Sequence, residues 1–210
     1  SDYIIGVARR LNLEHETDEV GNILIRKPAC AGFENIPTVV LQSHIDMVCE
    51  KNSDTYHDFE NDPIIPRRDG EWIKATGTTL GADDGIGIAT QLAILEANDV
   101  EHGPLEMLFT IDEETGLTGA KGLKPGFLKG KVLLNLDSED EGELFIGCAG
   151  GQDTKLFMNY SRVAVNFDFT GFQIRVSGLQ GGHSGDDINK GRGNAVKILN
   201  RLLWSSSHLF

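Results

Sequence analysis

Three apolar segments of the sequence each end in side chains of the kind that bind metal ions. The segments that begin at residues 39, 105 and 132 are followed by a histidine or carboxylates: His44 and Asp46, then Asp112, Glu113 and Glu114, then Asp137. A fourth acidic pair, Asp83 and Asp84, lies in a glycine-rich stretch between the first two. A single carboxylate after a strand usually caps a helix or closes a turn. Four clusters in equivalent places indicate instead a shared functional site.

This set contains a histidine and carboxylates but no thiolate. One histidine and at least three carboxylates exceed the three protein ligands that a catalytic zinc ion normally takes. The set suits two divalent ions, roughly 3.5–4 Å apart and bridged by a carboxylate and a water; zinc, cobalt and manganese all tolerate such a site. In the pair Glu113 and Glu114, one residue can bind a metal while the other acts as general base. The simpler alternative for the pair is a capping cluster at a helix N-terminus.

His44 and Asp46 are two residues apart at the end of the first segment. In a strand this spacing places both side chains on one face. An aspartate in that position can fix the ring of a metal-binding histidine. A surface ion pair is the alternative, and it agrees less well with the apolar residues around the pair.

Two other motifs are incomplete. Ser184 lacks the glycine that a nucleophile elbow has two residues later. Residues 85–90 lack the third glycine or alanine of a dinucleotide-binding fingerprint. Cys148, in a glycine-rich turn, is explained more simply as a packed small side chain than as a nucleophile. None of these motifs predicts a function as well as the metal site does.

The composition is that of a globular chain with no affinity for polyanions. Of 210 residues, 40% are hydrophobic and 24% charged, and the formal charge of −13 repels nucleic acids and anionic membranes. No apolar run reaches the roughly 18–20 residues of a membrane span, and the first residues lack the basic-then-apolar pattern of a signal peptide. Three widely spaced cysteines without a CxxC pair favour a reduced, cytoplasmic setting.

Apolar periodicity predicts an α/β fold in two parts. Strands are expected at 22–26, 39–48, 105–111, 132–136 and 144–146, helices at 3–13 and 86–98, and a hairpin over 64–75 with its turn at Asp69-Gly70. Buried strands separated by a helix or a long crossover predict a mixed, largely parallel sheet, with functional sites beyond the carboxyl ends of its strands. After residues 147–151, alternating strands at 154–157 and 169–177 and a helix at 195–204 begin a smaller α+β unit. We expect domains at 1–152 and 153–210.

Five motifs together resemble the M20 family of co-catalytic metallopeptidases. They are residues 43–47, 77–87, 112–116, 135–143 and 181–185. Further segments, among them 147–151 and 191–195, agree with the subgroup of the family that hydrolyses dipeptides, including Xaa-His. The resemblance implies the N-terminal part of a zinc-peptidase-like catalytic domain at 1–152 and the first part of a lid domain at 153–210. An aminoacylase or carboxypeptidase of the same family and an inactive, truncated metal-binding fragment are the alternatives.

The resemblance implies two divalent metal ions, zinc in first place and cobalt or manganese as alternatives. Four ligands carry over: His44, Asp83, Glu114 and Asp137. His44 and Asp137 would bind one ion and Glu114 the other. Asp83 would bridge the two, because the family motif places the ligand first in the acidic pair. The family also has a cis peptide directly after this residue, here between Asp83 and Asp84.

The resemblance assigns catalytic roles as well. Glu113 would be the base that activates the attacking water, and Asp46 would hold the ring of His44. His183, in the smaller domain, would polarise the scissile carbonyl and stabilise the oxyanion. The substrate would be a dipeptide, and the whole protein could form a homodimer. The family has a further histidine ligand near the end of a much longer chain, so the 210 residues are expected to be an N-terminal part with little activity of its own.

Overall fold

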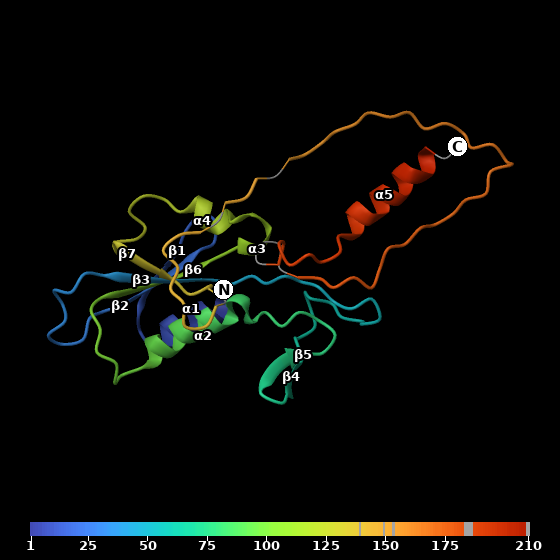
Figure 1. Ribbon diagram of the computed structural model, residues 1–210. Coiled ribbons are helices and arrows are strands. Elements are labelled where there is room, and N and C mark those ends of the chain that lie inside the picture. Colours follow the sequence, from blue (N-terminus) through green and yellow to red (C-terminus); the bar gives the residue numbers. More distant parts are fainter. Residues whose placement is uncertain (139, 149, 153, 183–186, 209–210) are drawn as a thin grey trace. The chain divides into compact units, whose positions relative to one another are not determined.

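The computed structural model describes residues 1–138, 140–148, 150–152, 154–182 and 187–208. The chain divides into two compact units, Ser1–Ala149 and Gly150–Phe210. Among the described residues, all strands belong to the first unit, and the second unit contains one helix (Figure 1). None of the helices in these ranges is both long and apolar enough to cross a lipid bilayer.

A five-stranded mixed sheet with the order β1-β2-β6-β3-β7 is the centre of the first unit. The strands span Glu14–Thr17 (β1), Ile23–Lys27 (β2), Val39–His44 (β3), Leu105–Thr110 (β6) and Val132–Asn135 (β7). β3 pairs in parallel with β6 and β7, whereas β2 pairs antiparallel with β1 and β6. Because β3, β6 and β7 run in one direction, their carboxyl ends meet at one edge of the sheet. The predicted mixed α/β sheet is confirmed.

Apolar layers cover both faces of the sheet, because successive side chains of a strand point to opposite faces. One layer contains alternate residues of the central strands and residues of two helices, α1 (Asp2–Arg10) and α2 (Ala82–Glu96): Ile23, Ile25, Leu41, Met107 and Phe109 with Ile4, Ala8 and Leu95. The other layer joins Leu24, Val40 and Leu108 to Leu123, Phe127 and Leu128. Figure 1 shows α1 and α2 side by side on one face. Burial on both faces explains why these strands are largely apolar in the sequence instead of alternating strictly between apolar and polar residues.

Some elements of the first unit differ from the prediction. β1 was not expected, because its residues, Glu-His-Glu-Thr, are polar and mostly exposed. β3 ends at His44 rather than at residue 48. α2 begins at Ala82, four residues before the predicted start, and its first turn contains non-helical φ/ψ angles at Asp83 and Asp84. The short strand predicted at 144–146 is absent, and its three side chains are exposed.

The predicted hairpin forms, but its turn is shifted by one residue. Its strands are β4 (Pro66–Asp69) and β5 (Trp72–Ala75), and Asp69 pairs with Trp72. The two turn residues are therefore Gly70 and Glu71, not Asp69 and Gly70. Gly70 has a φ of +63°, the conformation that a type II′ turn requires at its first central residue.

In the second unit the predicted helix forms as α5 (Ala195–Ser207). Asn194 caps it by accepting a hydrogen bond from the backbone N–H of Lys197 at 3.0 Å. The strands predicted at 154–157 and 169–177 are wrong, because neither segment forms a strand. A strand requires a partner for its backbone groups, and the described residues of this unit provide no ladder for either segment.

Candidate metal centre

His44, the last residue of β3, has a buried side chain whose two ring nitrogens face different groups. The side chain is 1% exposed. Nδ1 lies 3.0 Å from the backbone carbonyl of Asp46, which can only accept a hydrogen bond, so we place the proton of the neutral ring on Nδ1. Nε2 lies 2.9 Å from Oδ1 of Asp83 and 3.4 Å from Oδ1 of Asp137. A neutral ring held in this way presents the lone pair of Nε2 to a metal ion.

Asp83 and Asp84, at the start of α2, have different environments. Asp84 is 3% exposed, and its carboxylate accepts hydrogen bonds from the backbone N–H groups of His44 (3.2 Å) and Gly87 (3.1 Å). The carboxylate of Asp83 is half exposed and faces Nε2 of His44. The peptide bond between the two residues is cis, as the family resemblance implies. The hydrogen bonds of Asp84 thus connect α2 to the end of β3. The carboxylate of Asp83 remains available to bind a metal ion.

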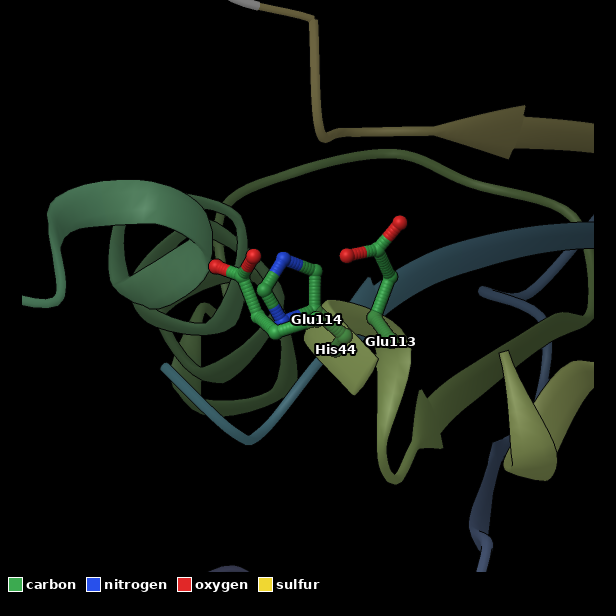
Figure 2. Close-up of side chains that lie close together, drawn as sticks. All are labelled: His44, Glu113 and Glu114. Carbon is green, nitrogen blue, oxygen red and sulfur yellow. The ribbon is translucent and has the colours of Figure 1, made fainter. Parts of the chain in front are cut away.

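Glu113 and Glu114 open the short helix α3 (Glu113–Gly116), which follows β6. The carboxylate of Asp46 accepts hydrogen bonds from their backbone N–H groups, at 3.0 Å from Glu113 and 3.1 Å from Glu114. Oδ1 of Asp46 also lies 3.5 Å from Nδ1 of His44. Figure 2 shows the carboxyl groups of Glu113 and Glu114 reaching the two sides of the His44 ring. Asp46 therefore links the end of β3 to both glutamates.

Two groups of potential ligands share His44. One consists of His44, Asp83 and Asp137, the other of His44, Glu113 and Glu114, and within each group one ligand atom per residue lies within 4.8 Å of the others. Nitrogen and oxygen donors at these distances suit zinc, manganese or cobalt. The residues present therefore agree with a metal site at this edge of the sheet.

Crowded negative charge also favours a cation here. Burial and the neighbouring carboxylate of Asp83 raise the pKa of Asp137 to about 7, although His44 opposes the shift. Burial and the charges of Asp83 and Glu113 likewise raise the pKa of Glu114. Burial disfavours the charged ring of His44, but the hydrogen bond to Asp83 and the charge of Asp137 outweigh it and raise the His44 pKa. In the described ranges no lysine or arginine forms an ion pair with these carboxylates, so a divalent ion would relieve their mutual repulsion.

Six of the seven residues predicted for the site therefore lie together in the first unit: His44, Asp46, Asp83, Glu113, Glu114 and Asp137. The seventh, His183, lies outside the described residues.

Asn22 supports the site and was not predicted as part of it. It is fully buried, and its amide joins three segments. Nδ2 donates to Oδ2 of Asp18 (2.7 Å) and to the backbone carbonyl of Gly119 (2.9 Å), and Oδ1 accepts from the N–H of Ile111 (3.2 Å). Ile111 directly follows β6, and Gly119 belongs to α4 (Thr118–Gly122). The two residues flank the segment that carries both glutamates. A polar residue directly before the apolar run Ile23–Ile25 was the one sequence signal for this role.

The site agrees with the comparisons to known proteins. The model of peptidase family M20/M25/M40 matches residues 40–182, a range that contains the six site residues that lie together. The chain belongs to this family. Over 97% of its length it is 54% identical to the cytosol non-specific dipeptidase of Escherichia coli (strain K12). M20 peptidases use metal ions, in agreement with the donor set described above.

Solved structures of family relatives share the fold. The aminoacylhistidine dipeptidase from Vibrio alginolyticus is 49% identical, with a TM-score of 0.70 over 96% of this chain. The aminopeptidase PepT from Bacillus cereus is 27% identical, with a TM-score of 0.55 over 66% of this chain. The chain spans 42% of the length of the E. coli relative and 41% of that of the Vibrio structure.

Proposed function

We propose that the natural protein hydrolyses dipeptides, Xaa-His among them, with the help of two divalent metal ions bound at the candidate metal centre. The observation that carries the proposal is that two adjacent groups of potential ligands, which overlap at His44, lie at one edge of the sheet. Two ions close together require adjacent ligand groups of this kind. The names of the E. coli and Vibrio relatives, both dipeptidases, favour this substrate class over an aminoacylase or a carboxypeptidase.

The geometry supports a division of roles among the ligands. His44 and Asp137 would bind one ion, with Nε2 of His44 as the donor atom. Glu114 would bind the other, and Asp83 would bridge them. The choice of Asp83 over its neighbour is supported by hydrogen bonding, because the carboxylate of Asp84 already accepts two backbone N–H groups.

Glu113 would act as the general base. Two divalent ions at this site would lower the pKa of a water molecule and polarise the peptide carbonyl. The carboxylate of Glu113 takes a proton from the attacking water as the new C–O bond forms. It then returns the proton to the amine nitrogen as the C–N bond breaks. Asp46 keeps this carboxylate near His44 through its hydrogen bond to the N–H of Glu113. His183 would stabilise the oxyanion.

Zinc is the metal we propose first, because imidazole with carboxylates is a common catalytic zinc environment; cobalt and manganese use the same donors. We also propose that the protein acts in the cytoplasm, as the name of the E. coli relative states for that enzyme. We also propose that the natural protein forms a homodimer. Measurement of its molecular mass in solution tests this.

The decisive experiment replaces Glu113 by Gln in the natural protein. Loss of a general base lowers kcat by roughly 10²–10⁴-fold. Glu101→Gln, at an exposed position, is the matched control and should retain normal kcat. Both variants should still contain two metal ions per chain by elemental analysis. Near wild-type hydrolysis by Glu113→Gln would refute the assignment of the base, and a wild-type protein without dipeptide hydrolysis would refute the proposed function.

A further inference from the structure

A cavity of about 640 Å³ adjoins the candidate metal centre. Its lining consists of Trp72, Ala82, Asp83, Asp84, Ile86, Leu136, Asp137 and Ser138. This volume lies within the range of roughly 300–1,000 Å³ that small-molecule sites occupy. Because Asp83 and Asp137 form part of the wall, a molecule in the cavity lies directly against the proposed metal ligands.

The wall has a carboxylate part and an apolar part. The apolar part includes two large side chains from different elements, Trp72 at the start of β5 and Ile86 in α2. Trp72 is 72% exposed and Ile86 is 68% exposed. Neither belongs to the two core layers of the sheet. Packing among the described residues of this chain therefore does not explain their type, whereas contact with a ligand would.

Apolar surface beside a reacting group binds the part of a substrate that does not react. Burial of an aromatic or aliphatic side chain against an indole ring is favourable, because it removes apolar area of both partners from water. The carboxylate part of the cavity, occupied by cations, would lie at the scissile peptide. The apolar part is then adjacent to a side chain of the same dipeptide.

We propose that Trp72 and Ile86 form a subsite for an aromatic or large aliphatic side chain of the dipeptide. This inference rests on the proposed function, which it extends by defining a preference. Trp72 and Ile86 determine specificity and take no part in the proton transfers assigned to Glu113. The subsite adjoins one end of the peptide bond, so it selects for one of the two substrate residues.

The test measures kcat/KM of the natural, metal-loaded protein for Ala-Ala and for two series, Phe-Ala and Leu-Ala against Ala-Phe and Ala-Leu. Trp72→Ala should lower kcat/KM for the bulky members of one series by roughly 10- to 100-fold, the range for loss of a hydrophobic pocket contact. Ala-Ala should change by less than about threefold, because its methyl groups make little use of the subsite. Ile86→Ala should reproduce the pattern more weakly. Ile73→Ala is the matched control, since Ile73 is exposed on the same hairpin and does not line the cavity.

A binding measurement separates the subsite from the chemistry. In the Glu113→Gln background, the preferred bulky dipeptide should change the tryptophan emission in a saturable way, and the change should disappear in Trp72→Phe. Equal loss of kcat/KM for all dipeptides including Ala-Ala, or unchanged values for all, would overturn the subsite while leaving the hydrolysis itself intact. Absence of the emission change would overturn the subsite whatever the kinetic measurements show. No hydrolysis of any dipeptide by the wild type, with the emission change present, would overturn the proposed function alone.

Discussion

Replacement of Asn22 by Ala tests how much the stability of the segments around the candidate metal centre depends on one buried amide. The Asn22 side chain makes three hydrogen bonds, to the carboxylate of Asp18, the carbonyl of Gly119 and the N–H of Ile111. Asp18 keeps its other donors, because its Oδ1 also accepts from the backbone N–H groups of residues 20–22. The groups left without a partner in Asn22→Ala are therefore the Ile111 N–H and the Gly119 carbonyl.

The expected loss follows from these three contacts. A hydrogen bond contributes about 0.5–1.5 kcal/mol net, more when one partner is charged, and each buried polar group left unpaired costs about 1–3 kcal/mol. For Asn22→Ala we expect the free energy of unfolding to fall by about 3–5 kcal/mol. Asn61→Ala is the matched control, because Asn61 also donates its amide to an aspartate, Asp58, at 2.8 Å, but at the surface. Its effect should stay within about 0.5 kcal/mol.

Urea unfolding followed by far-ultraviolet circular dichroism measures both variants. Steady-state kinetics of Asn22→Ala should also show a lower kcat, since Ile111 and Gly119 flank the segment that carries Glu113 and Glu114. If Asn22→Ala lost less than about 1 kcal/mol, or no more than Asn61→Ala, the three hydrogen bonds would not have the role assigned to them.

Three further predictions concern the same framework. Gly119→Ala should lower the free energy of unfolding in urea by about 1–3 kcal/mol or more, because its Cβ would lie 2.4 Å from Oδ1 of Asn22 and 2.5 Å from the Ile111 carbonyl oxygen. The control is Gly6→Ala, within α1 and with open space around it, which should raise the free energy of unfolding by about 0.5–1 kcal/mol. If Gly6→Ala were the more destabilising of the two, the packing described around Gly119 would be wrong. Asp46→Ala removes the acceptor of two N–H groups and should weaken metal affinity by roughly 10–100-fold in titrations with a competing chelator, whereas the exposed Asp54→Ala should leave it unchanged. Removal of metal with a chelator should lower the melting temperature, because the clustered carboxylates then repel one another; equal melting temperatures with and without metal would argue against a bound cation.

The sequence predicted the site residues in the first unit because these depend on local patterns. Apolar runs identify buried strands, and the few residues at and after the end of each run lie at the carboxyl end of the sheet. His44 and Glu113 follow directly from this rule. Asn22 and Asp84 do not, because their roles depend on partners up to 97 residues away. The strands predicted in the second unit failed for a similar reason, since alternation shows that a segment can form a strand but provides no partner for it.

The position of His44 also depends on a register that apolar patterning alone leaves open. β3 is buried on both faces, so a slip of one residue would still place apolar side chains in both layers while moving His44 to the opposite face. Polar side chains oppose such a slip. Gln42 donates from Nε2 to Oγ1 of Thr110 in β6 at 3.1 Å and accepts from Nδ2 of Asn135 in β7 at 2.6 Å. These bonds connect the three parallel strands within a few residues of His44, Glu113 and Asp137. A polar residue in a buried strand thus fixes the alignment of the ligands without being one of them.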